Sequence, residues 1–171
     1  MTLDELLAVL RSMAAVPSEG GTYSELDHGL QCGAELARLA PDDLELQVAG
    51  LVHDVGHAFA DDASHGRAGA AAVRPLLGDR IADLVEGHVP AKRYLVTVDP
   101  SYADGLSPGS TITLDDQGGP LSADELAAFR ARPDWEDAVR LRRADDAAKV
   151  PGLIVPGLET WVEVLRSVVA R

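Results

Sequence analysis

The feature that most constrains this chain is an apolar helix that leads directly into an ionisable pair. Residues 48–52 (Val-Ala-Gly-Leu-Val) are apolar on nearly every side of a helix that we expect to run from Leu44 to about Phe59. A helix of this kind is buried, and His53 and Asp54 follow its apolar centre at once. Burying an isolated carboxylate is costly unless it is paired with a cation or binds a metal ion. The fold must therefore bring other groups to this pair.

The rest of the sequence predicts further helices, separated by glycine, proline and aspartate. Capping boxes at residues 2–5 and 122–125 mark two helix starts. Residues 99–120 are rich in proline and glycine, and we expect a long ordered loop with short helical turns there. We therefore expect an all-α fold, a helical bundle of one domain over residues 1–171. Its other helices are expected near the end of the chain and over residues 24–39, 65–77, 79–94 and 135–149.

Composition limits the functions open to such a fold. The 28 acidic residues against 15 lysines and arginines give a formal charge of −13, which excludes a general nucleic-acid-binding protein. A single cysteine, Cys32, excludes a disulfide framework and a cysteine-rich zinc site. The acidic N-terminal segment does not predict a signal peptide, and no apolar run is long enough to cross a membrane. We therefore expect a soluble cytoplasmic protein without a nucleic-acid or membrane partner, and its oligomeric state is not indicated.

The histidines and two of the aspartates indicate which groups meet the buried pair. His57 lies one helical turn after His53, so both rings share a face. A lone His-Asp pair more often caps a helix or satisfies a turn than binds a metal ion. The whole set along the chain favours a metal site instead, and its nitrogen and oxygen ligands suit iron, manganese or zinc. The set consists of His28, His53, Asp54, His65, His88 and Asp145.

Four segments carry a resemblance to a known family. Residues 51–57 (LVHDVGH) contain a His-Asp-x-Gly-His signature, and residues 25–31 (ELDHGLQ) are similar to the helix with the family's first histidine. Residues 87–95 (GHVPAKRYL) and 142–152 (RRADDAAKVPG) are similar to segments of one branch. The chain thus resembles the HD-domain superfamily, and within it the mixed-valence diiron oxygenases that cleave the carbon–phosphorus bond of small 1-hydroxyphosphonates. The predicted bundle would then be a single HD domain, with its metal-site core over about residues 22–152.

The resemblance implies a site for two iron ions in a mixed-valence Fe(II)/Fe(III) state. Asp54 would bridge the two ions through its two carboxylate oxygens. Asp146 competes with Asp145 for the last carboxylate, and Asp145 is preferred because it lies four residues before Lys149, as in the family's pattern. His65 follows the His-Asp pair at a shorter spacing than in some relatives. The terminal ligands would be His28, His53, His65, His88 and Asp145.

The two lysines of the chain, Lys92 and Lys149, each lie four residues after a proposed ligand. Side chains at that offset share a helix face, so both ammonium groups would point into the metal cavity. In an acidic protein, cations in a metal cleft suit an anionic group, and a phosphonate dianion is the natural candidate. Arg142 either adds a forked contact to the phosphonate or lies at the surface.

The resemblance adds further candidates around the metal site. Ser110 matches the region where the family supplies a hydroxyl to the phosphonate, and it is equally typical of a plain turn. His57 looks like the family's extra active-site histidine that binds the substrate, or else it orients a metal ligand. Tyr23 and Glu25 correspond to a lid used by some relatives, at a spacing from His28 that departs from the family's pattern.

The activity implied by the resemblance is that of an oxygenase. With O2, the enzyme would convert a small anionic organophosphonate into phosphate and a carboxylic acid. The same ligands would also serve a metal-dependent HD phosphohydrolase acting on a small phosphate ester or nucleotide, with other divalent metals in place of iron. A non-catalytic HD scaffold is disfavoured because no core ligand of the pattern is missing.

Overall fold

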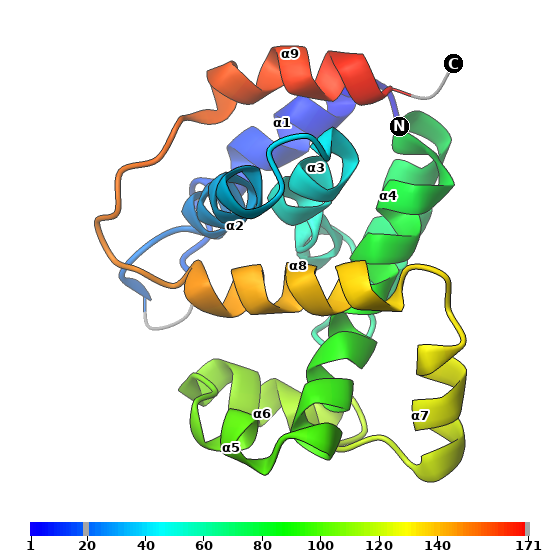
Figure 1. The fold of residues 1–171 in the computed structure, drawn as a ribbon. Helices are drawn as coiled ribbons and strands as arrows, with labels where there is room; N and C mark the ends of the chain where they lie inside the picture. The colour runs from blue at the N-terminus through cyan, green and yellow to red at the C-terminus, as the bar shows by residue number, and fades with distance from the viewer. Residues whose placement is uncertain (19–20, 170–171) are drawn as a thin grey trace.

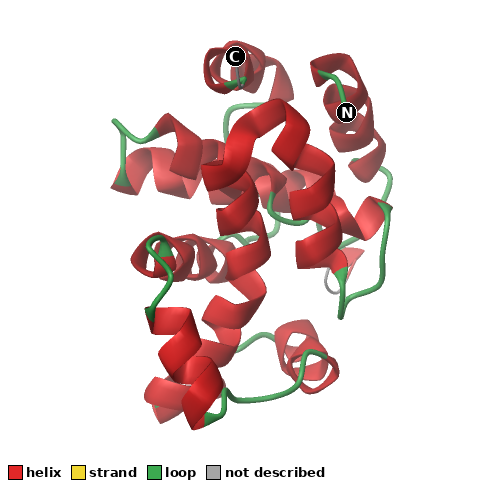
Figure 2. Ribbon diagram, turned by 90° about the vertical axis from the view of Figure 1, so that its right-hand side faces the viewer, coloured by secondary structure: helices red, strands yellow, loops and turns green. Residues whose placement is uncertain are grey.

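The computed structural model describes residues 1–18 and 21–169. Within these residues the chain is helical, with no β-strand, and the predicted all-α fold is confirmed (Figures 1 and 2). No helix in the described part is long and apolar enough to cross a membrane. The elements are α1 (Leu3–Met13), α2 (Glu25–Leu39), α3 (Leu44–Val52), the 3₁₀ helix η2 (Val55–Ala58), α4 (His65–Val98), α5 (Pro100–Asp104), α6 (Pro108–Asp116), α7 (Ala123–Arg130), α8 (Trp135–Ala147) and α9 (Leu158–Val168).

Local sequence signals set most of the helix starts. Both predicted capping boxes form, because the Thr2 hydroxyl accepts from the Glu5 amide and Ser122 does the same for Glu125. A third capping box, at the start of α2, pairs Ser24 with Asp27. The next residue, His28, is buried in the core. These reciprocal hydrogen bonds satisfy amide groups that a helix start otherwise leaves without partners.

Five elements pack around the centre of the molecule. Helix α2 packs on α3 and on α8, and α4 packs on α3, η2 and α8. In Figure 1, α8 crosses the middle of the molecule, with α1, α2, α3 and α9 on one side and α5, α6 and α7 on the other. The candidate ligands therefore come from segments that are distant in sequence and adjacent in space.

The structure corrects the predicted extent of two helices. Helix α3 ends at Val52 and does not continue to Phe59, because the chain turns at the His-Asp pair before it enters η2. Helix α8 ends at Ala147, and Lys149 lies beyond it. The predicted break between residues 77 and 79 is present as a kink in α4, where Gly78 has φ of 83°, a value that favours glycine.

Residues 99–120 contain more helix than predicted. Instead of a loop with short helical turns, they form the five-residue helix α5 and the nine-residue helix α6. Pro100 and Pro108 occupy the first turns of these helices, where the missing N–H is not needed, and Asp99 and Ser107 cap them. The prolines that suggested a loop are therefore helix-start signals, and α6 brings Ser110 against α4 and α8.

Candidate metal centre

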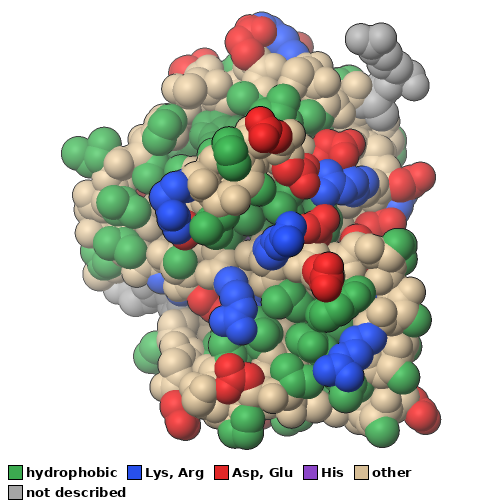
Figure 3. All heavy atoms as spheres, in the orientation of Figure 1, with side chains coloured by type: hydrophobic (Ala, Val, Ile, Leu, Met, Phe, Trp, Pro, Cys, Tyr) green, Lys and Arg blue, Asp and Glu red, His purple; other side chains and the backbone are tan. Residues whose placement is uncertain are grey.

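Four of the five histidines are buried at the meeting point of these helices. His28 comes from α2, His53 from the end of α3, His65 from the first residue of α4 and His88 from its second half. Each side chain exposes less than a tenth of its surface. On the face of the molecule drawn in Figure 3, no histidine is visible.

Each buried histidine is held through its Nδ1 atom by a backbone carbonyl. The Nδ1 atoms of His28 and His53 lie 3.0 and 2.8 Å from the carbonyl oxygens of Ala148 and Gly50. Those of His65 and His88 lie 2.7 and 2.6 Å from carbonyl oxygens three residues earlier in the chain. A carbonyl only accepts, so each Nδ1 carries a proton, and each ring in its neutral form, the form that binds a metal ion, presents a lone pair at Nε2.

These lone pairs face one another. The Nε2 atoms of His28 and His53 are 3.2 Å apart, and those of His65 and His88 are 2.9 Å apart. Two lone pairs cannot form a hydrogen bond, whereas two nitrogen ligands about 2.1 Å from one metal ion stand about 3 Å apart. The two histidine pairs therefore fit two metal ions.

Asp54 lies between the two histidine pairs. Its Oδ2 atom is 3.1 Å from Nε2 of His53 and 3.4 Å from that of His28. Its Oδ1 atom is 3.4 Å from Nε2 of His65 and 3.5 Å from that of His88. Burial alone raises the pKa of this carboxyl, but the surrounding histidines hold it well below its usual range. One carboxylate thus presents one oxygen to each pair, as a bridging ligand does.

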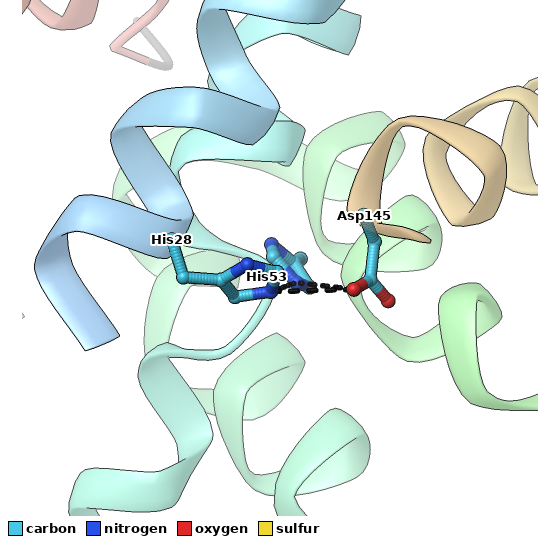
Figure 4. Close-up of side chains that lie close together, drawn as sticks. All are labelled: His28, His53 and Asp145. Atoms are coloured by element: carbon cyan, nitrogen blue, oxygen red, sulfur yellow. Dashed lines mark hydrogen bonds and ion pairs between the residues drawn. The ribbon is translucent and has the colours of Figure 1, made fainter. Parts of the chain in front are cut away.

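Asp145 lies next to the first histidine pair, that of His28 and His53. Its Oδ1 atom lies 3.2 Å from Nε2 of His28 and 3.9 Å from Nε2 of His53 (Figure 4). The neighbouring Asp146 is directed elsewhere, accepting hydrogen bonds from Tyr102 and Arg142. Of the two candidate aspartates, Asp145 is the one that the structure brings to the histidines.

The same carboxylates govern protonation when no metal ion is bound. Burial by itself lowers the pKa of His28, but Asp145 and Asp54 outweigh it and raise this pKa to about 10. Burial and the charge of His65 lower the pKa of His88 well below its usual value. Binding of a metal ion by His28 and His53 would therefore displace the proton that the two carboxylates stabilise on His28.

His57 lies beside the second histidine pair, that of His65 and His88, and is itself exposed. Its ring stacks on that of His65 with the ring centres 4.1 Å apart, and its Nε2 atom is 3.8 Å from Oδ1 of Asp54. On the other edge, Nδ1 is 3.4 Å from the carboxylate of Asp62. His57 also lines the adjoining cavity, so it can reach a bound molecule as well as the metal centre.

A cavity of about 500 Å³ opens onto both histidine pairs and holds a group of cations. Lys92 is 2% exposed, and its Nζ atom donates to Oγ1 of Thr113 over 2.8 Å. Nζ of Lys149 lies 2.8 Å from Oγ of Ser110, and an Nη atom of Arg142 lies 3.2 Å from the same oxygen. Two cations therefore meet at the buried hydroxyl of Ser110, and Nζ of Lys92 lies 3.3 Å from the backbone carbonyl oxygen of the same residue.

Arg142 links this cation group to the metal centre. It is 4% exposed, which excludes the alternative of a surface arginine. Its Nη1 atom lies 2.8 Å from Oδ2 of Asp145, and its Nε atom donates to the hydroxyl of Tyr102 over 3.0 Å. Ser110 is also buried, in α6, and is not a plain turn residue.

The candidate lid residues lie at the rim of the cavity. Glu25 is among the residues that line it, and the ring of Tyr23 is centred 6.3 Å from that of His28. Ser24, which lies between them in the chain, forms an isolated antiparallel bridge with Pro17. The structure thus places the ring of Tyr23 near that of His28, and the side chain of Glu25 on the cavity.

Comparison with known proteins follows this geometry. A family model described as HD domain matches residues 26–145, well over half of the chain. The chain belongs to the HD-domain family. The resemblance carried by the His-Asp-x-Gly-His signature is confirmed.

Two relatives of this HD domain carry informative names. A hydroxymethylphosphonate dioxygenase from Gimesia maris is 38% identical over 151 residues, which cover 82% of this chain and 75% of the relative. The 1-hydroxy-2-(trimethylamino)ethylphosphonate dioxygenase (glycine-betaine-forming) from Leisingera caerulea is 34% identical over 147 residues, covering 80% and 74%. The likeness to phosphonate dioxygenases thus extends over most of the HD domain.

Sequence reasoning missed three residues that shape the cavity. Thr113 and Gln117 line it from α6 and the residue that follows this helix, and Tyr102 holds Arg142 from α5. The carboxamide of Gln117 also donates to the backbone oxygen of Asp62, beside the metal centre. Thr113 and Gln117 lie three and seven residues after Ser110, which is a helical spacing. This spacing becomes informative only once residues 108–116 are recognised as a helix.

Proposed function

We propose that this HD domain is a non-haem diiron oxygenase that cleaves the carbon–phosphorus bond of a small 1-hydroxyphosphonate with O2. The reaction consumes one O2 and yields one phosphate, one carboxylate and one proton. The observation that carries the proposal is that the metal centre and the cation group share one cavity, joined by the contact between Arg142 and Asp145. The names and the extent of the two relatives support the same reaction.

In this proposal six ligands, five of them buried and Asp54 half-buried, would hold two irons. His28, His53 and Asp145 bind one ion, His65 and His88 bind the other, and Asp54 bridges them. When bound as a mixed-valence Fe(II)/Fe(III) pair, the irons supply Lewis acidity and the redox chemistry with O2. The protein orients each imidazole through its Nδ1 hydrogen bond, so that the ligand geometry is fixed before substrate arrives.

The cation group binds the phosphonate. Lys92, Lys149 and Arg142 offset the charge of the dianion, and Arg142 offers planar N–H groups that match phosphonate oxygens. The Ser110 hydroxyl accepts hydrogen bonds from Arg142 and Lys149, so its own proton is left to donate to the anion. His57, which also lines the cavity, contributes a further contact to the substrate.

Glu25 lines the same cavity, and the ring of Tyr23 lies near that of His28, which also lines it. We assign Tyr23 and Glu25 the role of a lid over the first histidine pair, in accordance with these positions. A lid that excludes water from the reacting groups strengthens their electrostatic interactions and protects reactive species from side reactions.

Oxygen dependence tests the proposed reaction directly. Iron-loaded, partly reduced protein is mixed with 1-hydroxy-2-aminoethylphosphonate or hydroxymethylphosphonate, in air and under strict anaerobic conditions. We expect one phosphate released for each O2 consumed, no release without O2, and an electron paramagnetic resonance signal of a coupled Fe(II)Fe(III) pair. Phosphate release at equal rates with and without O2 would overturn the oxygenase assignment.

The second candidate function is that of a metal-dependent phosphohydrolase acting on a small phosphate ester or nucleotide. The observation that favours it is that Lys92, Lys149 and Arg142 suit a phosphate ester as well as a phosphonate. Protein loaded with manganese, magnesium or zinc would then hydrolyse phosphate esters under anaerobic conditions. The same pair of anaerobic and aerobic assays therefore separates the two functions.

The pH dependence of substrate capture is expected to report Lys92. Burial, together with the charges of Arg142 and Lys149, lowers the pKa of Lys92 to about 8, although Asp145 and Asp146 act in the opposite direction. Below this pKa the ammonium is charged and attracts the phosphonate; above it the cation is lost. We therefore expect kcat/KM to fall as the pH rises through about 8.

The control for this pH profile is Lys92→Met. This variant is expected to have a lower kcat/KM at neutral pH and to lack the decline near pH 8, because the titrating group is gone. A decline that persists unchanged in the variant would show that another group, such as water on the metal centre, is responsible.

A further inference from the structure

Lys149 does not owe its position to a helix. Helix α8 ends at Ala147, and Lys149 belongs to the irregular segment that leads to Pro151. Its Nζ atom nevertheless lies 2.8 Å from Oγ of Ser110 and 3.3 Å from Oγ of Ser107. Something outside α8 must therefore fix the backbone on both sides of this lysine.

Helix α2 supplies that support from two side chains one turn apart. The Nδ1 atom of His28 donates to the carbonyl oxygen of Ala148 over 3.0 Å. The carboxamide of Gln31 holds Val150 at both of its backbone groups, because Nε2 donates to the carbonyl oxygen over 3.0 Å and Oε1 accepts from the amide over 3.1 Å. The residues before and after Lys149 are both bound to α2, whose end lies beside α8 in Figure 1.

The burial of Gln31 shows that this contact is a specific one. The residue is 3% exposed, although Val150 itself is largely exposed. A buried carboxamide is costly unless its donor and acceptor are both used, and here both are used by one residue of the adjacent segment. Lys149 directly precedes Val150 in this segment. The hydrogen bonds between Gln31 and Val150 therefore fix the position of the Lys149 ammonium group.

We propose that Gln31 is a positioning residue for the phosphonate site, acting through Lys149. The inference rests on the proposed function, in which Lys149 binds the anion. Gln31 touches neither the anion nor the metal ions. It holds the segment so that the ammonium meets Ser110, and displacement of a binding group by about 1 Å is enough to weaken its contribution substantially.

The test compares Gln31→Met with a matched control, Gln47→Met. Gln47 is 4% exposed, and its Nε2 atom donates to the carbonyl oxygens of Ala40 and Pro41 over 2.8 and 3.1 Å. The two glutamines thus share side chain, burial and a pair of hydrogen bonds to backbone, but Gln47 binds Ala40 and Pro41, whereas Gln31 binds the residue that follows Lys149. Methionine preserves length and removes the hydrogen bonds.

Binding of inorganic phosphate to the iron-loaded protein is measured by calorimetry, and turnover of the phosphonate is measured in parallel. For Gln31→Met we expect phosphate to bind about tenfold more weakly and KM to rise by a similar factor, with kcat within about twofold and iron content unchanged. For Gln47→Met we expect a comparable loss of thermal stability without either binding effect.

A double-mutant cycle with Lys149→Met separates positioning from general loosening of the fold. If Gln31 acts through Lys149, then Gln31→Met has no further effect on phosphate affinity once Lys149 is replaced. Additive effects in this cycle would overturn the proposal, as would equal behaviour of the two glutamine variants or loss of iron from Gln31→Met.

A second variant keeps the test decisive where Gln31→Met does not fold. Gln31→Glu retains an acceptor for the Val150 amide and loses the donor to its carbonyl, so we expect an intermediate weakening of phosphate binding, about threefold. Unchanged affinity in this variant would overturn the inference. Failure of the wild-type protein to bind phosphate at all would instead overturn the anion site itself, and with it the proposed function.

Discussion

Asp54→Ala is expected to lose both metal ions and to cleave phosphonate at least about a thousandfold more slowly, equivalent to about 4 kcal/mol of transition-state stabilisation. The reason is the position of the carboxylate, with Oδ2 facing His53 and His28 and Oδ1 facing His65 and His88. Removing it leaves four neutral imidazoles without a negative charge between them. Among the described residues, no other carboxylate forms an ion-pair contact with both histidine pairs.

Iron content per chain and the electron paramagnetic resonance signal measure this expectation. Two further variants give it contrast: Asp145→Asn should weaken one ion only, because Asp145 faces only the pair of His28 and His53. Asp146→Asn should retain both ions, since its carboxylate contacts Tyr102 and Arg142. Two irons retained in Asp54→Ala, or iron lost from Asp146→Asn alone, would refute the ligand assignment.

The fold could be predicted where local signals decide it. The capping boxes of α1 and α7 depend on residues three apart, and both form as predicted. The end of α3 could not be predicted, because it depends on how His53 and Asp54 meet residues from α2 and α4. Residues 99–120 were misjudged for a different reason: proline at the first turn starts a helix, and the same residue also marks a loop.

The candidate site shows a similar division. The ligand set came from motifs and their resemblance to a family, and the structure brings all six of those side chains together. The sequence does not show the backbone hydrogen bonds that orient these ligands, such as the one between His28 and the carbonyl of Ala148. Thr113 was missed because its contact with Lys92 exists only once α6 is a helix. Support of this kind depends on tertiary packing, which no spacing along the chain records.

Gly56→Ala is expected to cost about 3 kcal/mol or more in the free energy of unfolding and to empty the second metal position. A Cβ atom at Gly56 would overlap the carbonyl oxygen of His65 and would lie 2.6 Å from its carbonyl carbon and 2.8 Å from the amide nitrogen of Gly69. These are backbone atoms of α4 and cannot move aside as a flexible side chain would. Relief requires η2 and the start of α4 to separate.

That separation moves His65 away from His88, because His65 is the first residue of α4. The Nε2 atoms of the two histidines are 2.9 Å apart before the change. Iron content should therefore fall to about one ion per chain, with the pair of His28 and His53 retained. Chemical denaturation measures the stability loss, and Gly105→Ala is the control, since its Cβ would approach the nearest backbone oxygen only to 3.6 Å. If Gly56→Ala unfolds at the same denaturant concentration as Gly105→Ala and keeps both irons, then contact between η2 and α4 does not shape the metal position of His65 and His88.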